Sequence, residues 1–412
     1  MRQRHPTAKT LVLVLCLSCL WTPLSADSAA PLRLYIDADR GVTRASAEAI
    51  RMGVETALAQ VGHTAAGRRI DVVVLDHRGN SKRSLLNLRR YLGDPHALAV
   101  IGGKQSPPYL RHNLFIQENE ILLLLPWSAA GPVTRPESAP NWIFRLSIDD
   151  TKAGRFLAQD AVLRRGCKHN ALLLVDTGWG RSNRGRITRA LQELGHPPTG
   201  THMFARGIGE AEARALVRTI SASGADCVIM VPSMAESILL VHSFADLAPH
   251  IRISSHWGHA GGNFADVVSY AVRETVALRF LHTCFPFDAV DRGPFAEEIA
   301  RSARNLFPDR FEDYHTLPAS VGFVHAFDVT RLLLAALEQA GLGTDIIQTR
   351  RRVRTALETL DGEVQGLMRV YHRPYAPYRP QTPDAHEALG ADDLCMVAYG
   401  PSNELATSFP ER

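Results

Sequence analysis

Hydroxyl and indole side chains in this 412-residue sequence recur just after short apolar runs. Ser106, Trp127 and Ser128 follow two such runs in the first third of the chain, and Trp179 and Trp257 follow later ones. A serine hydroxyl can donate a hydrogen bond to a carboxylate, and an indole ring offers a broad apolar face with one polar N–H group. Residues of these types at successive strand ends are typical of a site that binds a small organic molecule.

Motifs for nucleotide binding and nucleophilic catalysis are incomplete in this chain. The loop at 37–41 contains no G-x-G-x-x-G pattern. The stretch at 101–106 resembles a P-loop only in part, because Leu98 replaces the first glycine and Gln105 replaces the serine or threonine. The stretch at 180–185 has the wrong spacing for the G-x-S-x-G turn that carries a nucleophilic serine. We therefore predict a protein that is not an enzyme and that holds no cofactor.

Neither metal binding nor nucleic-acid binding is indicated by the residue types. His256 and His259 are the closest histidine pair, but the intervening glycine indicates a loop, and no acidic residue stands beside them. The formal charge of +4 falls to +1 once Arg2, Arg4 and Lys9 leave with the N-terminal leader. A protein so close to neutral lacks the positive surface that nucleic-acid binding requires.

Residues 1–26 have the three parts of a secretory signal peptide. A positively charged start is followed by the apolar run Leu11–Trp21 and then by small residues near Ser25 that suit cleavage. The apolar run is short for a membrane span, so an N-terminal anchor is the less favoured alternative, as is a lipoprotein anchored at Cys19. We expect an exported, soluble protein of the periplasm whose mature chain starts between about residues 27 and 31.

Four cysteines remain after the leader is removed: Cys167, Cys227, Cys284 and Cys395. An even number in an oxidising compartment favours disulfides, and three pairings are possible. None of the four belongs to a C-x-x-C motif, so zinc binding and thioredoxin-type chemistry are not supported.

Short apolar runs alternate with longer amphipathic stretches along most of the chain. Runs rich in Val, Ile and Leu indicate strands buried on both faces, and their alternation with helices predicts parallel sheets. We expect strands over 32–37, 70–76, 97–102, 121–125, 170–176, 201–204, 226–231, 251–254 and 394–399. We expect helices over 45–61, 81–92 (capped by Ser81), 107–118, 153–165, 183–194, 210–223, 235–245, 294–306, 317–340 and 345–360. Because the pattern restarts near residue 150, it predicts two α/β lobes.

The segment 371–383 differs in composition from the rest of the chain. It contains Tyr371, Tyr375 and Tyr378 together with several prolines, which exclude a regular helix or a central strand. We interpret it as an ordered surface loop, and a partner-contacting or ligand-gating segment is the alternative.

Seven stretches occur in an order and at spacings shared with a known family. They are Ala45–Gln60, Gly67–Asp76, Ala99–Gly103, Leu125–Ala129, Trp142–Asp150, Leu174–Gly180 and Phe327–Gly341. Together they resemble the type I periplasmic binding proteins, specifically the branched-chain amino-acid-binding family that serves ABC transporters. The resemblance implies two Rossmann-like lobes with parallel-sheet cores, joined by a three-strand hinge, with the ligand in the cleft between them. It implies an N-terminal lobe of 31–146 with 285–390 and a C-terminal lobe of 147–284 with 391–412.

The resemblance also implies which loops hold the ligand. In the family, the residues matching Ser106 and the turn at 128–130 bind the ligand carboxylate, and the aromatic residue matching Trp179 covers it. We predict ligand contacts from Gln105, Ser106, Trp127, Ser128, Ala129, Trp179, Ser233, Met234, His256 and Trp257. The expected protein is a monomeric receptor that captures a small molecule and delivers it to the membrane subunits of an ABC transporter.

One loop departs from the family. Amino-acid-specific members carry an acidic residue for the ligand ammonium in the loop at 255–263, and this loop contains no Asp or Glu. An unpaired ammonium group is costly in a closed cleft, whereas Trp127, Trp179 and Trp257 would form a large apolar surface. We therefore predict an aromatic, carboxylated or larger apolar, lipid-like ligand rather than a free branched-chain amino acid.

Three alternatives stay open from the sequence. Glu236, which follows a predicted strand, could supply the missing acid and restore an amino-acid ligand. The same fold could serve as a ligand-sensing subunit of a membrane receptor. Catalytic groups that lie far apart in the sequence could meet in the cleft and make the protein an enzyme.

Overall fold

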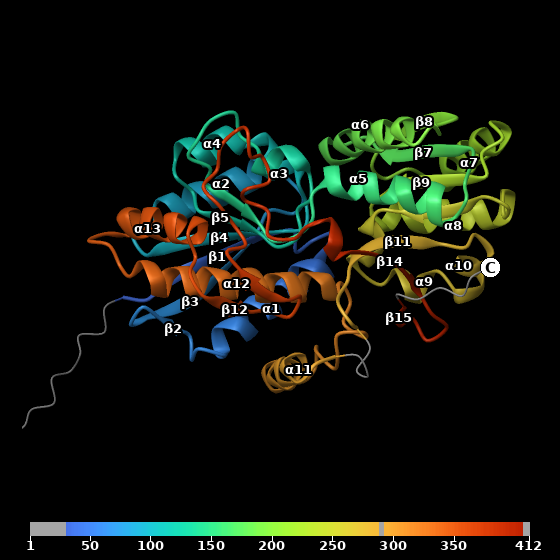
Figure 1. Ribbon diagram of the computed structural model, residues 1–412. Coiled ribbons are helices and arrows are strands. Elements are labelled where there is room, and N and C mark those ends of the chain that lie inside the picture. The colour runs from blue at the N-terminus through green and yellow to red at the C-terminus, as the bar shows by residue number, and fades with distance from the viewer. Residues whose placement is uncertain (1–29, 288–291, 407–412) are drawn as a thin grey trace, which may run out of the picture.

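Two lobes, each built on one β-sheet, lie side by side (Figure 1). The computed structural model describes residues 30–287 and 292–406, so the predicted signal peptide at 1–26 lies outside the described residues. Both sheets are mainly parallel and are covered by helices. This is the α/β fold with parallel-sheet cores that the alternating pattern of the sequence predicted.

The first sheet has the strand order β2-β3-β1-β4-β5-β6, and its neighbours pair in parallel except for β2 and β3. Its strands are β1 (Leu32–Ala38), β2 (Thr64–Ala65), β3 (Arg68–Asp76), β4 (Ala97–Gly102), β5 (Leu123–Leu125) and β6 (Ile143–Arg145). On β1, Leu34 and Ile36 face one core and Tyr35 faces the other. Because both faces are buried, the strands read as continuous apolar runs.

The second sheet has the strand order β15-β14-β11-β10-β9-β7-β8. Its strands are β7 (Asn170–Val175), β8 (Gly200–Phe204), β9 (Cys227–Val231), β10 (Arg252–Ser255), β11 (Arg279–Thr283), β14 (Leu394–Tyr399) and β15 (Leu405–Ala406). The strands β7 to β11 pair in parallel, and the late strands β14 and β15 are antiparallel additions at one edge. The sequence did not predict β11, where Arg279 and His282 interrupt the apolar run.

Helices cover the sheets of both lobes (Figure 1). The helices of the first lobe are α1 (Arg44–Ala59), α2 (Ser81–Leu92), α3 (Pro107–Arg111), α4 (Asn113–Glu118), α11 (Pro294–Leu306), α12 (Ser320–Ala340) and α13 (Ile346–Glu358). Those of the second lobe are α5 (Asp150–Gln159), α6 (Gly178–Glu193), α7 (Glu210–Ala222), α8 (Met234–Leu247), α9 (Phe264–Val267) and α10 (Tyr270–Thr275). Short 3₁₀ or π turns occur at 131–134, 160–164, 257–261 and 391–393.

Helix α12 forms the centre of the first lobe. Its length and apolar composition would suffice to cross a membrane, but 89% of its apolar stretch is buried inside the protein, as in the core helix of a globular domain. Helix α1 packs closely against it, since a Cβ atom at Gly53 would lie 2.3 Å from the carbonyl oxygen of Phe323. Only a glycine permits this approach of two helix backbones.

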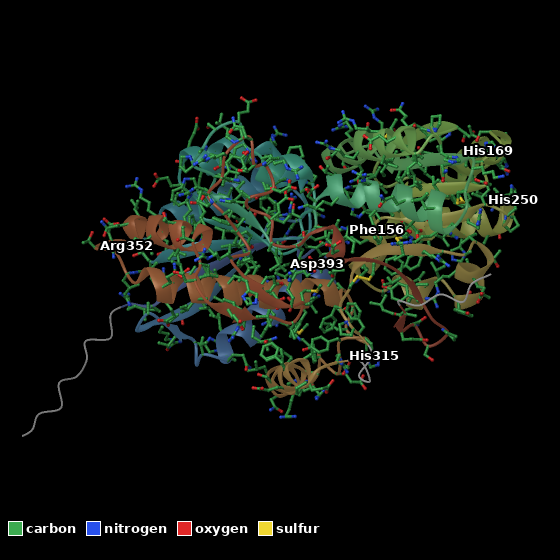
Figure 2. All side chains as sticks on the ribbon, viewed as in Figure 1. Phe156, His169, His250, His315, Arg352 and Asp393 are labelled. Carbon is green, nitrogen blue, oxygen red and sulfur yellow. A yellow bond between two sulfur atoms is a disulfide. The ribbon has the colours of Figure 1, made fainter. Side chains whose placement is uncertain are left out.

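Three connections link the two sheets and together form the hinge. The first leaves β6 for α5, the second leaves β11 for α11, and the third enters β14. The Leu389 N–H group donates to the Leu146 carbonyl (3.1 Å), which pairs the third connection with the first. The Cys284 N–H group donates to the carbonyl of Asp393 (2.9 Å), which pairs the second connection with the third. Asp393 lies between the lobes (Figure 2). The domain boundaries within these connections stay a prediction.

A buried ion cluster fixes the first connection to the third. The fully buried Arg145 side chain donates from Nη2 to Oε1 of Glu387 (2.5 Å), and Lys152 Nζ lies 2.7 Å from the other oxygen of that carboxylate. Arg135 bonds to Asp149, which is the N-cap of α5. Buried charges are tolerated when they are paired and hydrogen-bonded, and each of these five groups has an opposite partner.

Two helix boundaries differ from the sequence expectation. Asn80 rather than Ser81 caps α2, because the Asn80 side chain accepts hydrogen bonds from two backbone N–H groups of the first turn. The helix expected over 107–118 is divided into α3 and α4 at His112.

The proline- and tyrosine-rich segment packs into the first lobe. Tyr371, Tyr375 and Tyr378 are each at most 4% exposed, and the hydroxyl of Tyr371 donates to Asp328 on α12 (2.7 Å). A short hairpin of β12 (Glu363–Gln365) and β13 (Val370–His372) opens the segment. The tyrosine rings therefore belong to the core, and the interpretation of this segment as a surface loop was wrong in that respect.

Two disulfides resolve the pairing that the sequence left open. Cys167–Cys227 lies within the second lobe, and Cys284–Cys395 joins the second and third hinge connections. Replacing Cys284 and Cys395 by Ser removes a cross-link between residues 111 positions apart, which is expected to lower the free energy of unfolding by about 4 kcal/mol. Denaturant unfolding measures this loss.

The Cys167→Ser, Cys227→Ser double variant is the matched control. Its cross-link spans 60 positions, and the stabilisation grows only logarithmically with that span, so a similar loss is expected. An unchanged unfolding midpoint in the Cys284, Cys395 variant would contradict a hinge held by this bond.

Candidate functional site

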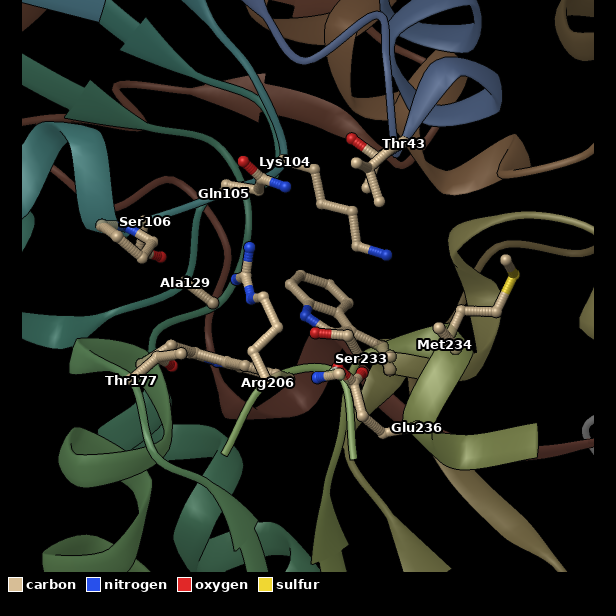
Figure 3. Close-up of a pocket in the computed structure, with 17 residues that line it drawn as sticks. Thr43, Lys104, Gln105, Ser106, Ala129, Thr177, Arg206, Ser233, Met234 and Glu236 are labelled. Atoms are coloured by element: carbon tan, nitrogen blue, oxygen red, sulfur yellow. Dashed lines mark hydrogen bonds between the residues drawn. The ribbon is translucent and has the colours of Figure 1, made fainter. Parts of the chain in front are cut away.

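A cavity of about 260 Å³ lies between the two lobes, at the carboxyl ends of the parallel strands of both sheets (Figure 3). In open α/β sheets this edge is where ligands bind, because loops and helix N-termini converge there. The lining residues are Val42, Thr43, Lys104, Gln105, Ser106, Pro107, Ala129, Thr177, Trp179, Arg206, Gly207, Ser233, Met234, Ala235, Glu236, Trp257 and Gly258. The loops after β1, β4 and β5 supply one wall, and those after β7 to β10 supply the other.

Ser106 provides a hydroxyl group on the first-lobe wall. Its Oγ atom accepts hydrogen bonds from the N–H group of Ala130 (3.1 Å) and from the hydroxyl of Ser128 (2.9 Å). Both acceptor positions of the Ser106 oxygen are thus occupied, and its own proton remains available for an anionic group in the cavity. Ser128 is buried behind Ser106 and orients it.

The turn at 128–130 is held from behind by the hinge. Arg145 Nη1 donates to the carbonyl oxygens of Ala130 (3.0 Å) and Ser128 (3.4 Å). The N–H group of Asp150, the first residue of α5, donates to the carbonyl of Ala129 (2.9 Å). All three carbonyl groups of the turn are therefore bonded to Arg145 and Asp150, the residues at the two ends of the first hinge connection.

Gln105 links the cavity wall to the loop after β1. Its Nε2 atom donates to Oδ2 of Asp39 (3.0 Å), and the other carboxylate oxygen accepts from the N–H groups of Gly41 (3.0 Å) and Val42 (3.1 Å). This buried carboxylate fixes the loop that carries Val42 and Thr43 to the mouth of the cavity.

Lys104 brings a positive charge into the cavity from the first lobe (Figure 3). Its Nζ atom lies 5.0 Å from the ring centre of Trp127, and it has neither a hydrogen bond nor an ion pair within the described part of the chain. Burial and the positive charge of Arg206 lower the pKa of Lys104 to about 8, against the opposing effect of Glu236. The ammonium group is thus a partly desolvated cation without a counter-ion in direct contact.

Arg206 and Glu236 bring opposite charges from the second lobe. Arg206 lies in the exposed loop between β8 and α7, and its guanidinium reaches toward Gln105 in Figure 3. Glu236 lies in the first turn of α8, is 3% exposed, and accepts a hydrogen bond from the N–H group of Gly207 (2.8 Å). With Lys104, these are the three charged side chains among the lining residues that the structure describes.

Trp179 lies on the second-lobe wall in the first turn of α6. The helix begins at Gly178, five residues earlier than the sequence predicted, because the hydroxyl of Thr177 caps it. The indole N–H group of Trp179 donates to Oδ1 of the fully buried Asp150 (3.1 Å), and His256 Nε2 lies 3.3 Å from the same oxygen. This shared carboxylate holds the indole in place, and burial raises the pKa of Asp150.

Trp257 lines the cavity, and the buried Trp127 packs against the Trp257 ring. The two rings meet edge to face with their centres 6.1 Å apart, and Trp127 is only 1% exposed. A Cβ atom at Gly258 would lie 1.9 Å from the carbonyl oxygen of Pro232, so a glycine is needed where the loops after β9 and β10 meet.

The structure brings most of the predicted site residues to one cavity. Those on its wall are Gln105, Ser106, Ala129, Trp179, Ser233, Met234 and Trp257, and their contact with a ligand stays a prediction. Trp127, Ser128 and His256 lie in a second layer instead, because their side chains are used to support Lys104, Ser106 and Asp150 respectively. Sequence reasoning missed two charged residues of the wall. Lys104 is one of only five lysines in the chain, so its rarity was a signal that could have been used. Arg206 could not be distinguished from the many other arginines by its residue type.

Two clusters of potential metal ligands occur in the described residues. Cys167 and Cys227 lie beside Asp226 but are consumed in their disulfide. Asp149, Asp384 and Glu387 converge in the hinge, where Arg135 and Lys152 already neutralise them. Both clusters are therefore accounted for by bonds within the protein.

The family profile of the periplasmic binding proteins matches residues 35–375, which is most of the chain. The chain belongs to the periplasmic binding protein family. The resemblance that the sequence motifs indicated is thereby confirmed. None of the curated proteins matches the sequence.

Solved structures of other periplasmic binding proteins share the fold. A type 1 periplasmic binding protein from Bordetella pertussis Tohama I is 16% identical with a TM-score of 0.74, and the match covers 92% of this chain and 100% of that one. A leucine-binding protein from Thermotoga maritima is 16% identical with a TM-score of 0.69 and coverages of 92% and 98%. A solute-binding protein of an ABC transporter from Rhodopseudomonas palustris HaA2, in complex with p-hydroxybenzoic acid, is 14% identical with a TM-score of 0.71 and coverages of 92% and 96%.

In this periplasmic binding protein, Trp179 lines the cavity and also packs against the hydrophobic core. Trp179 packs against two core clusters, one within the second lobe and one that extends through both lobes, so Trp179→Ala is expected to lower the free energy of unfolding by about 2 kcal/mol. Trp179→Phe keeps most of the packing and loses one hydrogen bond, which costs about 1 kcal/mol.

Urea unfolding of both variants measures these losses. Wild-type stability in Trp179→Ala would contradict the packing role.

Proposed function

We propose that this periplasmic binding protein is exported, captures a small aromatic carboxylate between its lobes and delivers it to an ABC-type membrane transporter. The observation that carries the proposal is the entry of Lys104 and Arg206 into one cavity from opposite lobes. Against these two cations the wall offers the single carboxylate of Glu236, so the cavity has a net positive charge and favours an anion.

The ligand carboxylate fits the first-lobe wall. The free proton of Ser106 and the unpaired ammonium of Lys104 are the donors available there, and hydrogen bonds to a charged group contribute about 1.5–3 kcal/mol each. This placement agrees with the family pattern, in which the position of Ser106 serves the ligand carboxylate.

An aromatic ligand body fits the remaining wall. Trp179 and Trp257 present indole surfaces, and Val42 and Met234 add apolar surface at the mouth. A volume of about 260 Å³ lies below the range of about 300–1,000 Å³ that holds drug-sized ligands, so a small ring compound is favoured over a lipid-like one. Solute-binding proteins of similar fold from Rhodopseudomonas palustris hold benzoate and p-hydroxybenzoic acid, which supports this class.

An anionic ligand is expected to favour closure of the two lobes. Lys104 and Arg206 repel each other across the cavity, and this repulsion lowers the pKa of Lys104 further than burial alone does. A carboxylate placed between them removes this repulsion, so the ligand binds the closed state more tightly than the open one. A difference of this kind is what shifts a two-state equilibrium. The two disulfides agree with an exported protein, since such bonds persist in oxidising compartments.

Titration calorimetry with benzoate, cyclohexanecarboxylate and leucine tests this proposal. We expect benzoate to bind most tightly and leucine, as a zwitterion, to bind weakly. Lys104→Met and Arg206→Met should each weaken benzoate binding by at least about tenfold.

Lys82→Met on the exposed face of α2 is the matched control and should leave binding unchanged. Tight leucine binding that disappears in Glu236→Gln would restore an amino-acid ligand. Failure of every carboxylate to bind would overturn the proposed class.

The affinity for benzoate should depend on pH through Lys104. Its ammonium carries the charge below pH of about 8 and loses it above, whereas benzoate stays ionised throughout, so affinity should be highest below about pH 8 and fall above it. The other charged or titratable groups that face Lys104 are Arg206, Glu236 and His259, and burial lowers the pKa of His259 to about 3.

Calorimetry from pH 6.5 to 9.5 measures this dependence. Above about pH 8 the affinity for benzoate should fall by at most about tenfold per pH unit. Lys104→Arg keeps a cation that does not titrate in this range, so its profile should be flat. An equal fall in wild type and Lys104→Arg would assign the titration to another group.

A further inference from the structure

Glu236 has half of its carboxylate unused. Its Oε1 atom accepts from Gly207, but its Oε2 atom has no hydrogen-bond partner within the described residues, although the side chain is 3% exposed. A buried carboxylate oxygen without a donor is costly, and the cost is removed when a donor arrives. Because Glu236 lines the cavity, a bound ligand can be that donor.

We propose that the ligand is a hydroxylated monocarboxylate whose hydroxyl group donates a hydrogen bond to Oε2 of Glu236. This inference rests on the proposed function and deepens it by naming a second recognised group. The ligand carboxylate is held by Lys104 and Ser106 of the first lobe, and the hydroxyl by Glu236 of the second. Figure 3 shows Lys104 and Glu236 on opposite sides of the cavity.

The charge balance of the cavity selects a monoanion. Lys104 and Arg206 contribute two positive charges and Glu236 one negative charge, so a ligand of net charge −1 leaves the closed cavity neutral. A zwitterionic amino acid leaves one positive charge, and a dicarboxylate leaves one negative charge. Burying an uncompensated charge is strongly unfavourable, so a neutral hydroxyl fits Glu236 better than an ammonium or a second carboxylate does.

A purely structural role explains only one oxygen of Glu236. The bond to Gly207 fixes the loop that carries Arg206, and Oε1 alone makes it. Ser233, the N-cap of α8, has no side-chain capping bond, and Glu236 does not reach back to complete one. Within the described part of the chain, Oε2 therefore lacks a partner that the fold itself would supply.

The test compares ring carboxylates that carry a hydroxyl group, a methoxy group in its place, or neither, so that only the first can donate a hydrogen bond. Benzoate, 3- and 4-hydroxybenzoate and the matching methoxybenzoates are titrated into wild type, Glu236→Gln and the control Glu212→Gln, which removes a charge from the exposed first turn of α7. In wild type, at least one hydroxybenzoate should bind about tenfold or more tightly than both its methoxy analogue and benzoate.

Glu236→Gln should remove this preference while benzoate binds as well as before or more tightly. The amide can keep the bond to Gly207 through its oxygen, and its NH₂ group then faces the ligand, where it cannot accept a hydroxyl proton. Glu212→Gln should retain the wild-type preference. A preference that survives in Glu236→Gln overturns the assignment to Glu236.

The wild-type titrations alone keep the inference falsifiable if Glu236→Gln does not fold. Equal affinities for the hydroxy, methoxy and unsubstituted compounds overturn the inference and leave the proposed function standing. Binding of none of the carboxylates overturns the proposed function itself, so the two failures are distinguishable.

Discussion

The buried guanidinium of Arg145 is the interaction on which the rest of this structure depends. One of its nitrogens pairs with Glu387 in the hinge, and another donates to the carbonyl groups of the turn at 128–130. Removing one partner of such a buried pair leaves an uncompensated charge, which is far more costly than the pair itself. Because one rigid group bonds to both places, the turn in the cavity wall and the pairing of the first and third hinge connections are fixed together.

The two lobes contribute complementary chemistry to the cavity. The first supplies an ammonium and an oriented hydroxyl, and the second supplies a guanidinium, a carboxylate and two indole rings. Neither wall alone encloses the cavity, so both lobes are needed to surround it. A second layer of side chains, Trp127, Ser128, Asp150 and His256, lies beneath the walls and keeps the first layer in a fixed geometry.

Sequence reasoning succeeded where local pattern and topology agree. The strands at 97–102 and 394–399 were predicted to the residue because their apolar runs end sharply, and Ser106 was placed at the cavity because parallel strand ends share one sheet edge. The strand β11 was missed because its charged and polar residues are buried only through tertiary contacts. Arg206 could not be predicted, since its reach into the cavity depends on the path of the loop after β8, which periodicity does not encode.

The placement of β14 has a consequence for how the chain acquires its fold. This strand pairs with β11 in the second sheet, yet its cysteine lies 111 positions after the one to which it is bonded, and helices α11, α12 and α13 of the first lobe lie between. The second lobe therefore cannot finish its sheet until almost the whole chain has been synthesised. Such non-local pairing slows folding and prolongs the exposure of an open sheet edge. The lobe that is completed last is thus the one whose unfinished edge most needs protection from other chains while the protein folds.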